Sequence, residues 1–193
     1  LQSQAEGADV QGVDLRRQRR QGRLGRQTRR RGAALVEAIA GDAIVVDLEG
    51  SAAEAAELSR RANRLLSTPL GKDASATALS LAIASLVDAR SGRHADAITR
   101  RDGARRKLAN FDRSAPWFGI LGLIPLIRTS LLLDDAPTAL ELVHELDRKI
   151  EIQDRTTPLA RHIEQLRATV QAANDVYSDR SWGLTRAELR VVQ

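Results

Sequence analysis

The sequence predicts an all-α fold built from antiparallel helices. From residue 33 onward, apolar residues recur mostly at spacings of three and four, which is the periodicity of a helix with one buried face. Aromatic residues make up only 3% of the chain while Ala and Leu are abundant, so we expect an aliphatic core of the kind that closely packed helices form. Gly, Pro and Asp interrupt the pattern at intervals and predict the turns between helices.

The elements expected first along the chain are a short helix and an ambiguous segment. Ala33–Gly41 has helical periodicity, whereas Ala43–Leu48 is rich in β-branched residues and alone is typical of a strand. Because a single strand has no partner, we expect Ala43–Leu48 in a helix or an ordered connection. Ser51 and Glu54 then form a capping box at the start of the next helix. The later helices are expected over Ser51–Ser67, Ser75–Arg90, His94–Asn110, Trp117–Leu133, Ala136–Ile150 and Pro158–Ala173.

One segment is apolar enough to be compared with a membrane span. Its uninterrupted apolar run, Trp117–Ile127, is eleven residues long and ends at Arg128. It also contains Gly119, Gly122 and Pro125. Because a membrane span needs about 20 apolar residues, the segment predicts a buried helix, and we expect no membrane partner.

Two helix pairs are similar to each other. Each pair, Ala78–Leu108 and Trp117–Ile150, consists of an apolar helix, a short turn and a more charged helix that begins with a small residue. Aligning Ala97 with Ala139 gives a period of 42 residues. The pattern resembles the tetratricopeptide repeat, although that repeat spans about 34 residues and its aromatic and glycine positions are not matched here. We therefore predict a degenerate, tetratricopeptide-like antiparallel helical array, with an irregular helical bundle as the alternative.

The positive charge of the chain is concentrated near its N-terminal end. The net charge is +5, and residues 1–32 contribute nine Arg against three acidic residues. Residues 33–193 carry 21 basic and 22 acidic residues and are close to neutral. The tract Arg16–Arg31 has almost no apolar side chains, so it predicts a disordered arm. Such an arm can bind polyanions non-specifically; the alternatives are a solvated tail and a segment that does not belong to the native reading frame.

The residue constellations of common enzymes are missing from the sequence. Cys is absent, which excludes disulfides, thiolate metal sites and cysteine nucleophiles. Gly71-Lys72 is followed by Asp73 instead of the Ser or Thr of a phosphate-binding loop. His94, His144 and His162 do not have the spacing of metal ligands, and we expect them on solvated helix faces. We therefore predict no enzyme activity, catalytic residue, cofactor or metal.

A basic helix in the middle of the chain contains the candidates for contact with DNA. Its cationic residues are Arg100, Arg101, Arg105, Arg106 and Lys107. Arg101 and Arg105 are four residues apart and Arg106 lies partly beside them, so the three side chains form a basic stripe that can contact phosphates or an acidic partner. Acidic residues also lie close by, at Asp96, Asp102 and Asp112. The alternative, which we favour, is a solvated helix face.

The last ten residues predict the start of a further helix. Thr185 is a suitable N-cap, Glu188 completes a capping box, and Leu184 and Leu189 stand at the positions of a hydrophobic staple. The motif Leu-Thr-x-x-Glu-x-x-Val-Val resembles the opening of the LuxR-type helix-turn-helix domain. Together with the helical array before it, the motif resembles the C-terminal part of MalT-like regulators. The resemblance implies that Leu184, Thr185, Glu188 and Leu189 belong to the start of the first helix of a DNA-binding domain. The recognition helix of that domain would lie beyond residue 193.

These observations divide the chain into an Arg-rich tail (1–32), a helical array (33–176), and a linker with an incomplete helix-turn-helix (177–193). The resemblance implies a fragment of a cytoplasmic transcriptional regulator. Its helical array is expected to sense a protein or small-molecule effector, and only the intact regulator is expected to bind DNA. The alternatives are a helical-repeat protein interaction module and a truncated, non-functional gene product.

Overall fold

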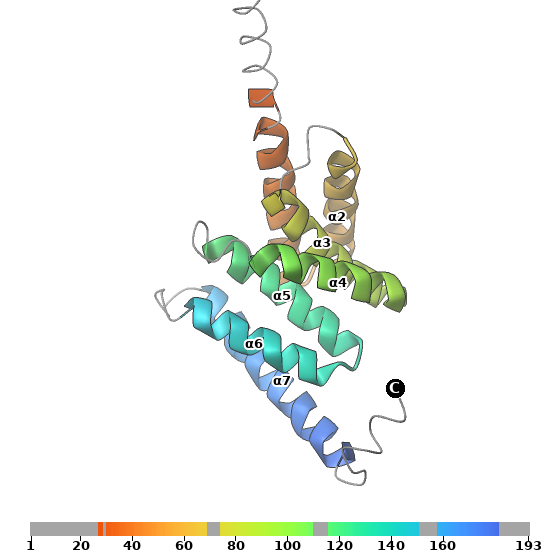
Figure 1. The fold of residues 1–193 in the computed structure, drawn as a ribbon, viewed down its shortest axis with the longest axis vertical. Helices are drawn as coiled ribbons and strands as arrows, with labels where there is room; N and C mark the ends of the chain where they lie inside the picture. The colour runs from red at the N-terminus through yellow and green to blue at the C-terminus, as the bar shows by residue number, and fades with distance from the viewer. Residues whose placement is uncertain (1–26, 29, 69–73, 110–115, 151–157, 182–193) are drawn as a thin grey trace, which may run out of the picture.

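The computed structural model describes residues 27–28, 30–68, 74–109, 116–150 and 158–181, which fold almost entirely into helices (Figure 1). No strand occurs among these residues, which confirms the predicted all-α class. The first helix extends over residues 30–48. The following helices are α2 (Ala52–Leu66), α3 (Ala74–Arg90), α4 (His94–Leu108), α5 (Pro116–Leu132), α6 (Ala136–Ile150) and α7 (Pro158–Ser181).

The helix boundaries recur at a constant interval, equal to the separation of Ala97 and Ala139 in the sequence; we call this interval the repeat period. α2, α4 and α6 each contain 15 residues, and their first residues, Ala52, His94 and Ala136, are separated by one repeat period. α3 and α5 each contain 17 residues and also begin one repeat period apart. The chain thus forms consecutive helical hairpins that lie side by side along the long axis of the molecule, with α7 after them (Figure 1). We call them hairpin 1 (residues 30–66), hairpin 2 (74–108) and hairpin 3 (116–150).

The turn inside each hairpin has the same backbone geometry. Gly50, Gly92 and Asp134, which again follow one another at the repeat period, have positive φ angles of 95°, 74° and 55°. This left-handed conformation costs Gly little, and Asp tolerates it better than most residues do. In each turn the following amide donates a hydrogen bond to the carbonyl five residues earlier, which ends the first helix. These bonds are Ser51 N to Val46 O (3.0 Å), Arg93 N to Asp88 O (2.9 Å) and Asp135 N to Ser130 O (2.9 Å).

α7 does not turn at the corresponding position. The residue one repeat period after Asp134 is Val176, a β-branched residue for which a positive φ is strongly disfavoured. α7 continues through Val176 and ends at Ser181. Residues 177–181 are therefore helical, which corrects the prediction of a linker that begins at Tyr177.

The first helix also differs from the expectation. It already includes residues 30–32, which the sequence assigned to the Arg-rich tail, and it continues without a break through Ala43–Leu48. Ala43 and Ile44 of the strand-like run are buried against α3, so packing outweighs local strand propensity. Ser51 precedes α2, but its side chain makes no capping hydrogen bond, and the predicted capping box is not formed.

α3 and α5 are the most buried helices and lie between their neighbours. In one core cluster, Leu79 and Ile83 of α3 pack against Val36 and Ile39 of the first helix. A second cluster joins α3 and α4 to α5, α6 and α7, with Leu123 of α5 fully buried. The apolar segment predicted as a buried helix is thus the centre of the core. No helix among the described residues combines the length and apolar character that a membrane span requires.

Each hairpin has a fully buried alanine three residues after the start of its second helix. Ala55, Ala97 and Ala139 are all 0% exposed. A methyl side chain at this place lets the two helices of a hairpin approach closely. The predicted alignment of Ala97 with Ala139 thus extends to Ala55 of hairpin 1, where the sequence pattern did not reveal it.

Candidate functional site

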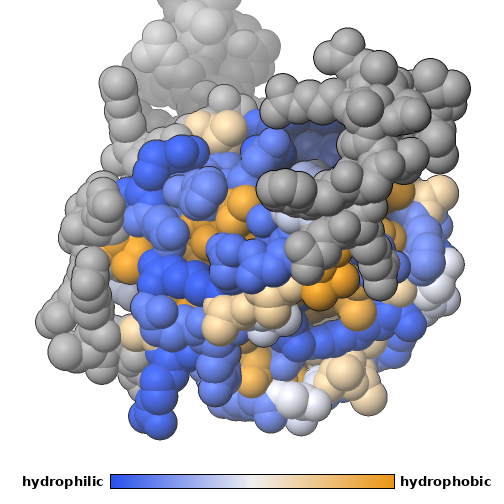
Figure 2. Space-filling model, turned by 90° about the horizontal axis from the view of Figure 1, so that it is seen from below, coloured by the Kyte–Doolittle hydropathy of each residue, from blue (hydrophilic) through white to orange (hydrophobic). Residues whose placement is uncertain are grey.

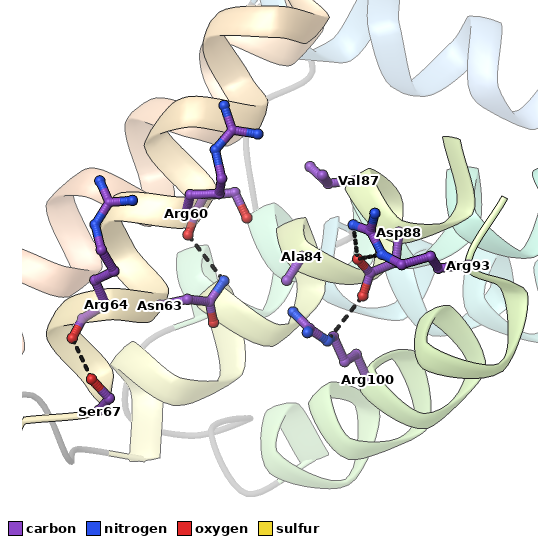
Figure 3. A pocket seen from close by; sticks show the side chains of 10 residues that line it. Arg60, Asn63, Arg64, Ser67, Ala84, Val87, Asp88, Arg93 and Arg100 are labelled. Atoms are coloured by element: carbon purple, nitrogen blue, oxygen red, sulfur yellow. Dashed lines mark hydrogen bonds and ion pairs between the residues drawn. The ribbon is translucent and has the colours of Figure 1, made fainter. Parts of the chain in front are cut away.

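A hollow of about 500 Å³ lies between α2, α3 and α4 (Figure 3). α2 belongs to hairpin 1, and α3 and α4 form hairpin 2, so the hollow lies where two hairpins meet. Its lining includes four arginines, Arg60, Arg64, Arg93 and Arg100, and one carboxylate, Asp88. We call this site the arginine hollow.

Asp88 anchors two of the four arginines. Its side chain is only 3% exposed, and its Oδ1 accepts a hydrogen bond of 3.0 Å from Nε of Arg93. Its Oδ2 lies 2.9 Å from Nε of Arg100 as an ion pair, without a well-aligned hydrogen bond. Since a buried carboxylate requires partners, both arginines are held in place. The terminal nitrogens of Arg100 point away from Asp88, toward the side of the hollow where Asn63 lies (Figure 3).

The other two arginines lie on α2, at the exposed rim. Nη2 of Arg60 is 2.7 Å from Oε2 of Glu57, and Nη2 of Arg64 is 3.3 Å from Oε1 of the same carboxylate. The hydrogen bond from Arg60, followed by that from Arg64, holds the pKa of Glu57 below its ordinary value. One carboxylate thus serves two guanidinium groups, and both retain N–H groups that can bind a ligand.

The predicted basic stripe on α4 is divided between two environments. Arg101 is only 7% exposed, which contradicts both a solvated face and an exposed contact with DNA. Its Nη1 donates to Oδ2 of Asp135 at 2.6 Å and to Oγ of Ser130 at 3.1 Å, so it joins hairpin 2 to the turn of hairpin 3. Arg101 is therefore a packing residue. The sequence did not reveal this role because Asp135 is 34 positions away.

Arg105 contributes to the same junction from a more exposed position. Its Nη1 is 3.1 Å from Oε2 of Glu141, and its Nε is 3.8 Å from Oε2 of Glu145, both on α6. Arg106 is exposed and lines a smaller hollow of about 330 Å³ together with Arg101 and Arg105. The arginines of α4 that face α6 are thus largely paired with carboxylates.

A second buried carboxylate joins three helices. Asp47, at the end of the first helix, is 5% exposed and forms ion pairs with Arg90 of α3 and Arg128 of α5. The three residues belong to different hairpins. Sequence reasoning missed this cluster, because its members are separated by 43 and 81 positions.

Lys149 is a further charged residue with an unexpected location. It is only 8% exposed, and burial lowers its pKa. Its aliphatic stem crosses α5 at Gly119, where a Cβ atom would lie 3.1 Å from Cδ of Lys149. The absence of a side chain at Gly119 therefore gives the lysine its path.

The remaining predictions concern the three histidines, a metal site and the proposed helix-turn-helix. His94, His144 and His162 are exposed, as expected. Within the described ranges, no cluster of three or more His, Cys, Asp or Glu side chains has the arrangement of a metal site. The residues proposed to open a helix-turn-helix, Leu184, Thr185, Glu188 and Leu189, lie outside the described residues, as does the tract from Arg16 to residue 26.

The comparisons with known proteins give no family assignment: no family model, no curated protein and no solved structure matches the chain.

Proposed function

We propose that this protein is the helical effector-binding region of a LuxR-type, MalT-like transcriptional regulator. The recurrence of hairpin boundaries at the repeat period carries this proposal. Arrays of stacked helical hairpins present extended surfaces and junctions between units, and these are common binding sites. The chain also ends in the motif Leu184–Val192, which resembles the start of a LuxR-type DNA-binding domain.

In this proposal the array receives the effector and does not itself contact DNA. The net charge of residues 33–193 is close to neutral, and two of the three candidate DNA contacts on α4, Arg101 and Arg105, are paired with carboxylates. Specific DNA binding then belongs to the intact regulator, in the cytoplasm. α7 extends past the position of the earlier turns, toward the helix-turn-helix motif in the sequence.

A second candidate is a self-contained protein interaction module. The same recurrence of hairpins supports it, since arrays of this kind often bind other proteins without a DNA-binding domain. The two candidates differ in what the sequence after Gln193 encodes.

Translation of the genomic DNA that follows the codon for Gln193 separates the two candidates. The regulator requires a continuation of roughly fifty residues with the pattern of the remaining helix-turn-helix helices. The extended chain should then bind duplex DNA in fluorescence anisotropy, while residues 1–193 alone should not bind with sequence specificity. A stop codon, or a continuation without this pattern, overturns the regulator and leaves the interaction module.

A further inference from the structure

The junctions between successive hairpins differ in charge. At the junction of hairpins 2 and 3, Arg105 of α4 meets Glu141 and Glu145 of α6. The positions of α4 that precede these glutamates by one repeat period are Thr99 and Gly103. α4 therefore offers no carboxylate to α2 at the equivalent place, and none of the ion pairs found in the described parts of the chain joins α2 to α4.

The α2 side of this junction is also altered. The positions that precede Arg101 and Arg105 by one repeat period are Ser59 and Asn63, and both line the arginine hollow. Two short polar side chains thus replace two long cationic ones. This exchange leaves a space of about 500 Å³ at the first junction, against about 330 Å³ at the second.

The lining of this space has more arginines than carboxylates, although the guanidinium groups of Arg60 and Arg64 are turned toward Glu57 and away from Arg100 (Figure 3). Four arginines line the hollow, and the carboxylates that pair with them are Asp88 and Glu57. Two negative charges therefore face four positive ones. Asp88 pairs with Arg93 through Oδ1 and with Arg100 through Oδ2, and Figure 3 shows the two arginines on opposite sides of its carboxylate. The terminal nitrogens of Arg100 point into the hollow, toward the side where Asn63 lies (Figure 3).

We propose that the arginine hollow binds a small, multiply charged oxyanion, which joins hairpins 1 and 2 as Glu141 and Glu145 join hairpins 2 and 3. The chemical class is a compound with phosphate groups or several carboxylates, because planar guanidinium groups pair with these oxyanions in bidentate fashion. The inference rests on the effector-binding role proposed above and assigns a site and a ligand class to it. Arg100 supplies the contact from α4 (Figure 3). Arg60 and Arg64 have exposed side chains, and in the bound state they turn from Glu57 toward the ligand.

The shape of the hollow favours a small molecule over nucleic acid. It is bounded by three helices, and its volume lies within the range of about 300–1,000 Å³ that is typical of small-molecule sites. Asp88 is buried and paired with Arg93 and Arg100, so a compact ligand contacts the arginines without reaching this carboxylate.

Isothermal titration calorimetry of the 193-residue chain with inorganic pyrophosphate and with citrate tests the proposal. Each titration is run at constant ionic strength set with NaCl, because exposed charges are screened by salt. We expect saturable one-to-one binding, and the stronger of the two probes identifies phosphate or carboxylate as the preferred group. A short DNA duplex serves as the third probe, and it should bind more weakly than the better small anion.

Four variants connect the binding to the hollow. Arg64→Gln, on the exposed rim, should weaken binding about tenfold, as expected for the loss of one charge-assisted contact. Arg100→Gln should weaken it at least as much, and circular dichroism checks its folding because it also removes a partner of Asp88. Arg105→Gln is the matched control at the second junction and should leave the affinity unchanged.

The fourth variant, Thr99→Glu/Gly103→Glu, places carboxylates where α6 has its glutamates. A Cβ at Gly103 meets only Leu81 at an ordinary 3.6 Å, so the variant is expected to fold. It should lose anion binding and unfold at a higher temperature than the wild type in the absence of ligand. Undiminished binding by this variant, binding to DNA alone, or no saturable heat with either small anion would each overturn the proposal. None of these results bears on the sequence after Gln193, so the regulator proposal is judged separately.

Discussion

Replacing Gly122 by alanine should destabilise the protein, although alanine is the better helix former. Gly122 lies inside α5, where it faces the end of α4. A Cβ atom built at Gly122 would lie 2.8 Å from both Cδ1 and Cδ2 of Leu108, which is fully buried. Carbon atoms in contact are normally about 3.5–4.0 Å apart. Leu108 or the α5 backbone must therefore shift by several tenths of an ångström within a packed core.

The size of the effect follows from two opposing terms. Overpacking of a core costs about 1–3 kcal/mol, whereas the change from Gly to Ala in a helix contributes up to about 1 kcal/mol. Gly122→Ala should therefore lower the free energy of unfolding by about 1 kcal/mol or somewhat more. Gly41→Ala is the matched control in the first helix, because a Cβ there meets nothing within 4 Å. It should raise the free energy of unfolding by about 0.5–1 kcal/mol.

Urea denaturation followed by far-ultraviolet circular dichroism measures both variants. The midpoints should move in opposite directions while the slopes stay constant, which shows that stability alone has changed. Leu108→Val in the Gly122→Ala background should recover part of the loss, because the shorter side chain leaves room for the new methyl group. If Gly122→Ala stabilised the protein as much as Gly41→Ala does, the close approach of α4 and α5 would be refuted.

Three further predictions concern charges and turns. Burial alone would raise the pKa of Asp135, but hydrogen bonds from Arg101 and Thr138 outweigh it and hold the pKa below its ordinary value. The stabilisation is therefore present above about pH 4 and is lost as the pH falls further. The difference in unfolding free energy between wild type and Asp135→Asn should shrink in acid titrations of urea midpoints. Asp47→Asn should cost about 2 kcal/mol in the same assay at pH 7, because two arginines lose a charged partner; an unchanged midpoint would contradict this role. Val176→Gly should lower the helical circular dichroism signal, since it permits a turn at the position where earlier hairpins have one, and a full wild-type signal would show that α7 does not depend on this side chain.

Much of the fold was predictable because its signals are local. The turns around Gly92 and Asp134 are each followed after a few residues by a buried alanine, and aligning these alanines revealed the repeat period. Hairpin 1 has the same turn at Gly50 and the same alanine at Ala55. It was not recognised because Ala43–Leu48 has strand propensity, and only its burial against α3 explains why it is helical.

The candidate site was less predictable because it depends on contacts between hairpins. Nothing near Arg101 in the sequence distinguishes it from Arg105. In the structure, however, Arg101 is buried in an ion pair with Asp135, whereas Arg105 is more exposed. The arginine hollow arises where α2 carries the short side chains of Ser59 and Asn63 and where α4 has Thr99 and Gly103 at the positions of the α6 glutamates. These pairs of facing residues can be recognised only when the sequences of the three hairpins are aligned at the repeat period.

For locating an anion-binding site, the distribution of charged residues is therefore more informative than the net charge. Residues 33–193 are close to neutral, which by itself suggests that no strong anion site exists in the folded part. The ion pairs between hairpins are nevertheless distributed unequally. Carboxylates of hairpin 3 pair with arginines of hairpin 2. Among the ion pairs of the described residues, no carboxylate of α4 pairs with an arginine of hairpin 1. Because Coulomb interactions weaken steeply with distance and screening in water, acidic residues elsewhere on the surface cannot neutralise the first junction. On the face of the molecule drawn in Figure 2, hydrophilic residues of the described part are interspersed with hydrophobic ones. A neutral helical array can thus hold a local anion site wherever one of its units lacks the carboxylates that the next unit has.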